Sequence, residues 1–276
     1  MKRIWLTTLF VLLTGTVEAA TIVSDNWDTW GTFSCTTHAC ADGYIQSPWS
    51  SFGLTDADGL TIGVNASYGR SGKGWRTTYV GGFKGAGINL GTIAGQDETY
   101  VRFYMKFGSN AHWSPAMSNG MKIFRWGLAP ELFRLEFGSS YDGLYIISDS
   151  AGGIYPRDHG TTYTWADFNN GVNDASYGGN VWRCIEVHGK FGASVGTDTV
   201  DIWVDGVQIM HATNQQLRSS TGNHMTTFNL GDNAEYLIGD LYFDDFIIST
   251  TYNGPTGGTT PTTSVVGVSI TGGSVR

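Results

Sequence analysis

Residues Trp182–Gly206, WRCIEVHGKFGASVGTDTVDIWVDG, contain two segments in which apolar and polar residues alternate. Segments 184–190 and 199–205 repeat with a period of two, which places apolar side chains on one face of a strand and polar ones on the other. A turn rich in glycine, serine, threonine and aspartate joins them, and Asp205-Gly206 begins the next reversal. An antiparallel pair with one apolar face is the unit of a sandwich. The stretch therefore predicts an all-β fold of two packed antiparallel sheets.

The same alternation recurs along the chain. Segment 99–107, TYVRFYMKF, would place Val101, Phe103, Met105 and Phe107 in the core and the intervening residues outside. Helical periodicity is essentially absent. One large all-β domain is expected over residues 21–255, with further strands at 60–64, 121–126, 132–137, 144–148, 207–211, 225–230 and 237–250.

The two ends of the chain differ from this domain. Residues 1–20 have a basic start, a short apolar run and small residues up to Ala20, which is the pattern of a secretory signal peptide. The apolar run is too short to span a bilayer. We therefore expect an extracellular or periplasmic protein with no membrane association after cleavage. Residues 256–276 form a Thr/Gly/Pro linker and tail, so the protein is expected to be a monomer or part of a longer modular chain.

Composition narrows the class of partner. The net charge of −8 argues against nucleic acid and anionic membranes as partners. The 39 glycines and the 13% aromatic content are typical of extracellular jelly rolls and sandwiches. No pattern for an organic cofactor is present; a glycine-rich run at 69–74 lacks the spacing of a phosphate-binding loop.

Three cysteines are present. Cys35 and Cys40 lie five positions apart in a loop of small residues, and in an oxidising compartment they would form a local disulfide. Metal binding by this pair is the alternative. Cys184 is expected to be a partly buried free thiol.

Two patterns point to a known superfamily. Trp182-x-x-Ile185-x-Val187, followed by VDIWVDG at 200–206, and the closing segment 241–250 with paired Asp244-Asp245, resemble the concanavalin A-like lectin/glucanase jelly rolls. These include laminin-G-like domains and several polysaccharide lyases, and segment 99–107 resembles a strand of bacterial secreted members. The resemblance spans most of 100–255 and implies a two-sheet antiparallel jelly-roll sandwich with a polysaccharide partner. It selects no activity, because this fold hosts hydrolases, lyases and binding modules.

The resemblance also implies a structural calcium ion. Asp25 and Asp245 resemble the ligand positions, with backbone oxygens near Gly72 as partners. The alternative is that both carboxylates cap turns.

Elimination on a uronic-acid polysaccharide would need cations to neutralise the substrate carboxylate, a base and an acid. Basic residues gather between 102 and 134, and one sheet face carrying all of them would form a cationic groove for an anionic polysaccharide. The alternative is an ordinary solvated face. The candidate base or acid residues are His188 and Tyr104, and the candidates for binding the carboxylate are Arg102 and Arg134. The candidate substrate-binding residues are Lys106, Lys122, Glu136, Lys190, His112, His159 and Tyr163.

Two other functions compete with the lyase. Exposed tryptophan and tyrosine rings stack on sugars, so a non-catalytic carbohydrate-binding module is the first alternative. A retaining glucanase needs two carboxylates about 5 Å apart on one strand face. The E-x-D-x-x-E string that provides them in this superfamily is absent, which disfavours the glucanase.

Overall fold

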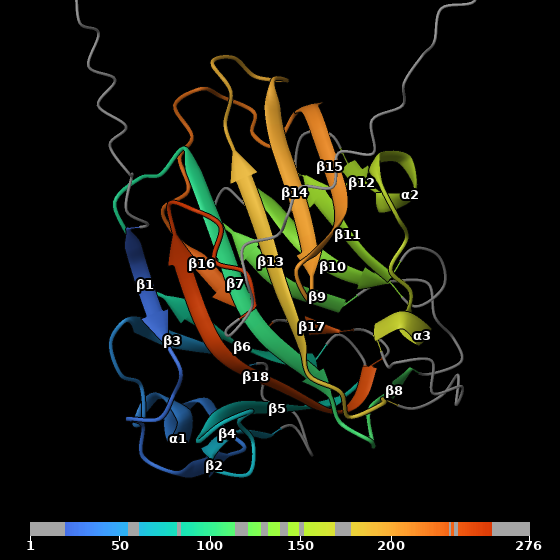
Figure 1. Cartoon of the computed structure of the whole chain (residues 1–276). Helices are drawn as coiled ribbons and strands as arrows, with labels where there is room; N and C mark the ends of the chain where they lie inside the picture. Colours follow the sequence, from blue (N-terminus) through green and yellow to red (C-terminus); the bar gives the residue numbers. More distant parts are fainter. Residues whose placement is uncertain are drawn as a thin grey trace, which may run out of the picture.

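Two antiparallel sheets packed face to face make up the described part of the chain (Figure 1). The computed structural model describes residues 20–54, 61–81, 84–113, 121–127, 132–138, 143–148, 152–168, 178–231, 233–234 and 237–255. The predicted all-β, two-sheet antiparallel jelly-roll sandwich is confirmed.

Sheet A lies in front in Figure 1 and contains the predicted hairpin. Its order is β15 (Val207–Gln215), β14 (Asp198–Val204), β13 (Arg183–Lys190), β7 (Glu98–Phe107), β18 (Leu237–Ser249), β5 (Gly74–Val80), β4 (Thr61–Asn65) and β2 (Phe33–Cys35). Two further strands pair with β18, namely β1 (Thr21–Asp25) and β8 (His112–Trp113).

Sheet B lies behind sheet A. Its order is β12 (Gly152–Ile154), β11 (Gly143–Ser148), β10 (Phe133–Gly138), β9 (Met121–Trp126), β16 (Phe228–Leu230), β6 (Lys84–Leu90) and β17 (Asn233–Ala234), and β3 (Trp49–Leu54) pairs with β6. Three short helices are present where helical periodicity gave no signal, because each is only about one turn long: α1 (His38–Asp42), α2 (Pro156–His159) and α3 (Trp165–Phe168).

The predicted hairpin of β13 and β14 is present, and the next reversal, at Asp205-Gly206, joins β14 to β15. Ile185 pairs with Val204 and His188 with Asp201, so the apolar residues share the inner face. At the end of β14, Asp205 and Gly206 have φ angles of 51° and 83°. Two consecutive positive φ angles are what a tight type I′ reversal requires, and they explain the choice of aspartate and glycine here.

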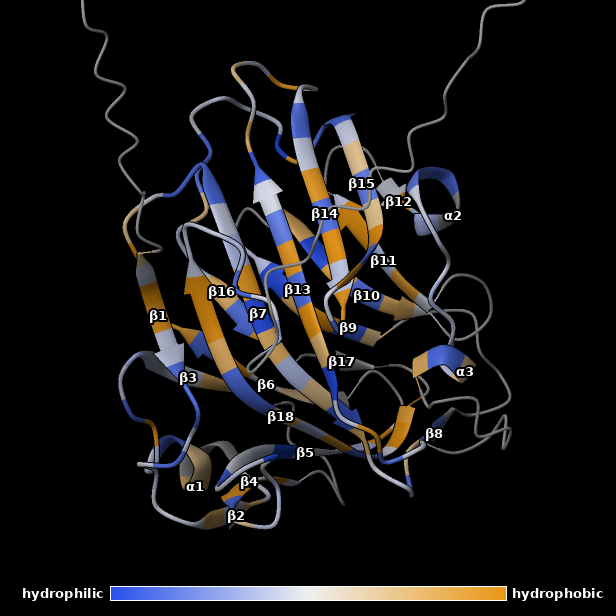
Figure 2. Cartoon of the chain, viewed as in Figure 1, coloured by the Kyte–Doolittle hydropathy of each residue, from blue (hydrophilic) through white to orange (hydrophobic). Residues whose placement is uncertain are grey.

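The core lies between the sheets, where alternate residues of facing strands meet. The four inward residues predicted on β7 are all 0% exposed. Phe103 packs edge-on against Phe124 of sheet B, with ring centroids 6.0 Å apart, and Phe107 packs on Phe137 at 5.6 Å. Orange and blue segments alternate along the strands in Figure 2, as a period-two pattern requires.

A C-terminal strap, residues 250–255, covers part of the outer face of sheet A. Glu186 accepts hydrogen bonds from the backbone N–H groups of Asn253 and Gly254, both at 2.7 Å. Arg102 donates from Nη1 to the Gly254 carbonyl at 3.3 Å. Glu186 is 1% exposed and Arg102 8%, and burial raises the pKa of the Glu186 carboxyl. These two outward residues therefore anchor the strap.

We expect Glu186→Ala to release the strap. The change leaves one buried N–H group, of Gly254, and one partly buried N–H group, of Asn253, without an acceptor, and should lower the free energy of unfolding by about 1–3 kcal/mol. Limited proteolysis followed by mass spectrometry should show faster cleavage within 250–255. Thr199→Ala, on the same face of neighbouring β14, is the control. Equal cleavage rates in wild type and Glu186→Ala would show that Glu186 does not hold the strap.

The predicted signal peptide and tail lie outside the described residues, apart from Ala20, and both stay predictions. Within the described part, no helix is long and apolar enough to cross a membrane.

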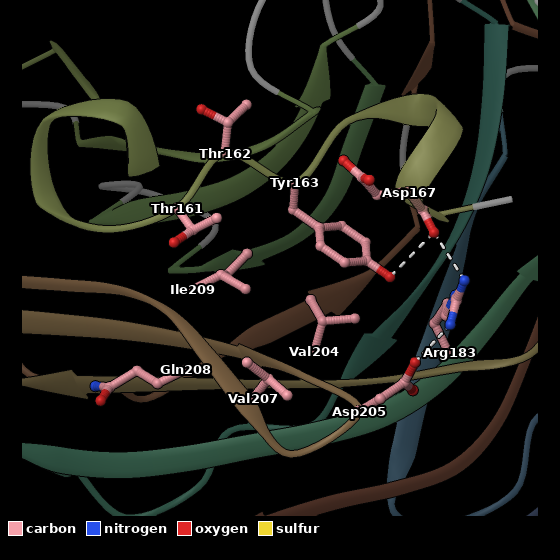
Figure 3. A pocket seen from close by; sticks show the side chains of 10 residues that line it. All are labelled: Thr161, Thr162, Tyr163, Asp167, Arg183, Val204, Asp205, Val207, Gln208 and Ile209. Atoms are coloured by element: carbon pink, nitrogen blue, oxygen red, sulfur yellow. Dashed lines mark hydrogen bonds and ion pairs between the residues drawn. The ribbon is translucent and has the colours of Figure 1, made fainter. Parts of the chain in front are cut away.

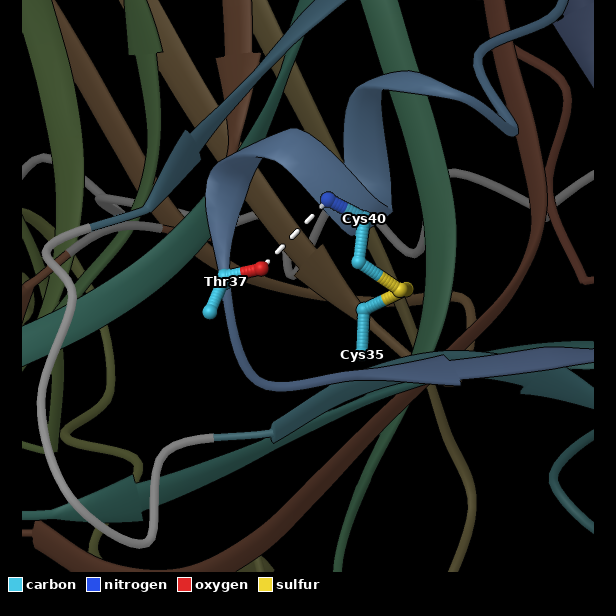
Figure 4. Close-up of a disulfide and its surroundings, with 3 residues drawn as sticks. All are labelled: Cys35, Thr37 and Cys40. Atoms are coloured by element: carbon cyan, nitrogen blue, oxygen red, sulfur yellow. Dashed lines mark hydrogen bonds between the residues drawn. A yellow bond between two sulfur atoms is a disulfide. The ribbon is translucent and has the colours of Figure 1, made fainter.

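The predicted disulfide between Cys35 and Cys40 is confirmed (Figure 4). It ties the end of β2 to α1, and the Thr37 hydroxyl caps this helix by accepting from the Cys40 N–H at 3.4 Å. Cys184 is a buried free thiol, and burial raises its pKa to about 12. A thiol with so high a pKa is a poor nucleophile near neutral pH.

Candidate functional site

The predicted cationic groove is divided between two sheets. Because the sheets pack face to face, their outer faces point in opposite directions. The prediction of one face is therefore wrong; alternation in sequence reports which side of a strand is polar but not which sheet the strand joins. Sheet A carries Arg102, Tyr104, Lys106, His188 and Lys190, whereas sheet B carries Lys122, Arg134 and Glu136.

His188 lies in a buried polar network on sheet A. Its Nδ1 is 2.7 Å from Asp201 and its Nε2 is 3.0 Å from Glu98, which also pairs with Lys190 at 2.9 Å. The ring stacks on Tyr100 with centroids 4.2 Å apart. Both ring nitrogens are thus engaged by carboxylates, and neither is offered to a substrate. This geometry does not support His188 as the catalytic base.

The other sheet A candidate for proton transfer is also enclosed. Tyr104 is 5% exposed and lies beneath the Arg70 guanidinium, whose carbon is 3.9 Å from the ring centroid. Arg102 is held by the strap. In this structure Tyr104 and Arg102 are therefore engaged by their own chain and are not offered to a substrate.

Three predicted binding residues lie at the edges. His112 on β8 contacts the Asn110 carbonyl at 3.1 Å, and His159 ends α2. Tyr163 lines a pocket of about 570 Å³ between the α3 segment and the β14–β15 turn (Figure 3). All three guanidinium nitrogens of Arg183 in this pocket are engaged by its own chain, because it pairs with Asp205 at 2.7 Å and donates to two carbonyls of α3.

The outer face of sheet B presents a continuous row of polar residues. Direct Cα partners link five neighbouring strands, β3, β6, β16, β9 and β10, through Ser51, Asn89, Asn229, Arg125 and Arg134. We call these five the amide–arginine row. Arg125 and Arg134 face each other directly on neighbouring strands, an arrangement that needs nearby negative charge, and Glu136 supplies it to Arg134 at 2.5 Å.

The amides of this row are oriented by one another. Asn229 donates from Nδ2 to Asn89 Oδ1 at 2.7 Å, and Asn89 donates from its Nδ2 to the Ser51 hydroxyl at 2.9 Å. Asn229 is 4% exposed, and its Oδ1 has no hydrogen-bond partner among the described residues. Gly87 lies beside it, and a Cβ there would come within 2.8 Å of the Asn229 amide nitrogen. The nearest atom to such a Cβ is the Gly231 carbonyl oxygen at 2.3 Å, so the close approach of the two backbones requires glycine at 87.

A second group lies next to the amide–arginine row. Glu136 accepts from Arg134 Nε at 2.5 Å and from the Tyr145 hydroxyl at 2.6 Å. Lys122 is the Cα partner of Glu136 on β9. Burial, and then the neighbouring Glu136 carboxylate, raise the pKa of Tyr145. The Tyr145 hydroxyl therefore keeps its proton at neutral pH.

Several residues of this face were missed from the sequence. Asn89, Asn229 and Tyr145 are each a single polar or aromatic residue between two buried apolar neighbours. That signal is present in the sequence, but each strand is short, and the pairing of Asn89 with Asn229 joins positions far apart in the chain. Arg125 is visible as one of the clustered basic residues, whereas its position opposite Arg134 requires the register.

The predicted calcium ligands Asp25 and Asp245 line one pocket of about 380 Å³. Asp25 accepts three N–H donors: the Trp27 backbone at 2.7 Å and the indoles of Trp30 and Trp49 at 3.0 and 2.7 Å. Asp245 pairs with Arg70 at 2.8 Å. In this structure Asp25 thus anchors three N–H groups and one oxygen of Asp245 pairs with Arg70, and the calcium ion at this pocket stays a prediction. No cluster of three or more potential metal-ligating side chains occurs in the described ranges.

Asp244, the neighbour of Asp245, anchors the glycine-rich loop at 69–74. Its carboxylate accepts from the backbone N–H of Arg70 at 2.6 Å and of Ser71 at 3.4 Å. The residue is 0% exposed, and burial raises its pKa to about 6. The loop is thus held by a carboxylate whose charged form is disfavoured by burial.

A pH dependence of stability follows from Asp244. Its folded-state pKa is raised above the ordinary 3.8, so the folded chain binds more protons than the unfolded chain between about pH 4 and 6. The contribution of Asp244 to the free energy of unfolding is fully present below pH 4 and is lost as the pH rises through 6. The total loss is up to about 3 kcal/mol. Urea unfolding at several pH values should show a flatter profile for Asp244→Asn than for wild type. Parallel profiles would contradict the assignment.

Comparison with known proteins supports the fold but identifies no activity. The sequence matches no protein-family model and no curated protein. Among solved structures, the alginate lyase Aly36B bound to an alginate trisaccharide is 12% identical, with 84% of this chain and 99% of that chain covered and a TM-score of 0.50.

Two further solved structures are similar at lower TM-scores. Domain 4 of a GH43 extracellular arabinanase from Geobacillus stearothermophilus, in complex with arabinotriose, is 16% identical over 84% of this chain and 93% of that chain, with a TM-score of 0.47. A carbohydrate esterase of a Shiga toxin-encoding bacteriophage is 13% identical over 85% and 100%, with a TM-score of 0.49. At such identities the likeness concerns the fold alone, and the fold of this chain is a two-sheet antiparallel jelly-roll sandwich.

Proposed function

We propose that the protein is a polysaccharide lyase that cleaves a uronic-acid-containing polysaccharide by β-elimination on the outer face of sheet B. The observation that carries this proposal is the placement of Arg125 directly opposite Arg134, beside the Asn229 amide. Two guanidinium groups with an adjacent amide can bind and neutralise a uronate carboxylate, which acidifies the proton on the neighbouring carbon.

The rest of the reaction needs proton transfer at the same sugar. A base removes the proton next to the carboxylate, a carbon–carbon double bond forms, the glycosidic carbon–oxygen bond breaks, and the leaving oxygen takes a proton. Tyr145, which holds its proton, is suited to protonate the leaving oxygen. Glu136 is our candidate for the proton acceptor, because each of its oxygens accepts one hydrogen bond, from Arg134 or from Tyr145, and keeps a second lone pair for the proton.

A non-catalytic binding module is the second candidate function. Tyr145 stacks on Tyr155 with ring centroids 5.3 Å apart, and a pair of tyrosine rings beside guanidinium groups can hold a sugar without reacting. A retaining glucanase fits this face poorly. Glu136 is the one carboxylate in the described strands of sheet B, and that reaction needs two.

The protein is proposed to act in an extracellular or periplasmic location. The Cys35–Cys40 disulfide supports this location, because disulfides persist in oxidising compartments.

The test is an elimination assay on a panel of uronate polymers. Product formation is followed by the ultraviolet absorbance of the unsaturated uronate, with neutral glucans as the control substrates. The lyase predicts absorbance that grows with at least one polyuronate and with none of the glucans. Binding to a polyuronate without any increase in absorbance would replace the lyase by the binding module.

A further inference from the structure

A second polar surface lies on the other side of the molecule, on the outer face of sheet A beyond the strap. Lys106 on β7 is the Cα partner of Tyr242 on β18, and Tyr242 is the partner of Arg76 on β5. Trp182 lies just before β13, next to Lys106, and Tyr68 lies over Arg76. We call these five residues the aromatic–lysine row.

Lys106 is the central cation of this row. Its Nζ is 4.9 Å from the Trp182 ring centroid and 4.5 Å from that of Tyr242. Among the described residues, no carboxylate forms a salt bridge with Lys106, and its contacts are these two rings. Partial burial lowers the pKa of the Lys106 ammonium. A half-buried cation with no counter-ion is electrostatically prepared for an anionic ligand.

The neighbouring groups provide a surface for a sugar ring. Tyr68 and Tyr242 have centroids 5.8 Å apart, and the Arg76 guanidinium lies 4.5 Å from the Tyr68 ring centroid. Arg76 is 4.0 Å from Asp240, so one carboxylate partly balances the row and Lys106 carries its uncompensated charge. Lys106, Tyr242 and Arg76 occupy three adjacent strands, which gives the row a length of roughly 10 Å.

The strap covers only the other half of this face. The aromatic residues Tyr100 and Trp203 lie against Tyr252 of the strap, with Trp203 and Tyr252 centroids 5.0 Å apart. The residues of the aromatic–lysine row keep partly exposed side chains. The outer face of sheet A thus has a covered half and an open half, and the open half carries the cation without a counter-ion.

We propose that the aromatic–lysine row is a second glycan-binding surface, which takes a polysaccharide segment bearing carboxylate or sulfate groups. The anion would pair with Lys106, while the rings of Trp182 and Tyr242 would pack against the sugar. The second surface rests on the proposal that the protein binds a polysaccharide, but it does not require the protein to be a lyase. Since the two sheets face opposite ways, a chain bound here would hold the protein on its polymer while sheet B remains accessible.

The test measures binding of the full chain to alginate, dextran sulfate and dextran by affinity electrophoresis. Lys106→Gln should raise the Kd for the anionic polymer about tenfold, as expected for a lost charge-assisted contact. Lys190→Gln is the matched control, because it removes the same charge from the same face at a lysine that is already paired with Glu98. Lys106→Arg keeps both the charge and the ring contacts and should bind as wild type does.

The outcomes separate the alternatives. Loss on alginate alone assigns a carboxylate ligand, and loss on dextran sulfate alone assigns a sulfate ligand. Equal weakening by Lys106→Gln and Lys190→Gln would reduce the effect to bulk charge and overturn the proposal, as would unchanged binding in Lys106→Gln. If Lys106→Gln does not fold, Trp182→Ala takes its place, and it should weaken binding of the anionic polymer more than Lys190→Gln does.

The lyase is judged separately from this surface. Elimination of a short soluble uronate oligosaccharide is measured on the wild-type protein alone. An absence of product overturns the lyase, whereas an absence of Lys106-dependent binding overturns the second surface.

Discussion

Tyr145→Phe lowers kcat for uronate elimination by about 100-fold or more, the usual contribution of a positioned general acid. The substitution removes one hydroxyl and keeps the ring that stacks on Tyr155. The leaving oxygen would then lack the proton that Tyr145 holds beside Glu136. Because the ring and the arginines remain, KM should change much less than kcat. Initial rates over a range of polymer concentrations measure both constants.

Tyr100→Phe is the control for this experiment. Tyr100 lies on the outer face of sheet A, and burial raises its pKa to about 12, so it resembles Tyr145 in chemistry but not in position. We expect its kcat to stay close to that of wild type. If both variants lose activity equally, or if Tyr145→Phe loses none, Tyr145 does not protonate the leaving group.

Asp25→Ala destabilises the folded protein by about 3–6 kcal/mol, because it leaves two indole N–H groups and one backbone N–H without their acceptor. Trp27, Trp30 and Trp49, which carry these N–H groups, are at most 3% exposed, whereas Asp25 itself is half-buried at the pocket. Urea unfolding measures the loss of stability. The exposed Asp42→Ala is the control and should change stability little.

This prediction also decides between an anchor and a calcium ligand. If Asp25 acts through the three N–H groups, the wild-type Tm is the same with EDTA and with added calcium. A Tm that falls with EDTA and recovers with calcium would show that Asp25 and its surroundings bind the ion.

The two faces of each strand follow from the sequence because alternation is a local property. The four inward residues of 99–107 and the hairpin at 182–206 could be recognised from neighbouring positions alone. The same reasoning placed Lys122, Arg134 and Glu136 outward, and all three lie on the face that carries the candidate site. The local disulfide was equally accessible, since its cysteines are close in the chain.

What the sequence by itself determined is therefore the strand pattern, the all-β sandwich and the outward polar residues. Tertiary structure alone decided which of these residues meet. The register brings Arg125 opposite Arg134 of the next strand, and β16, which is distant in sequence, brings Asn229 beside them. The strap and the carboxylates enclose Arg102 and His188, which looked equally suitable as sequence. The physical reason is that side-chain alternation is set within a strand, whereas sheet membership and burial depend on long-range pairing and packing.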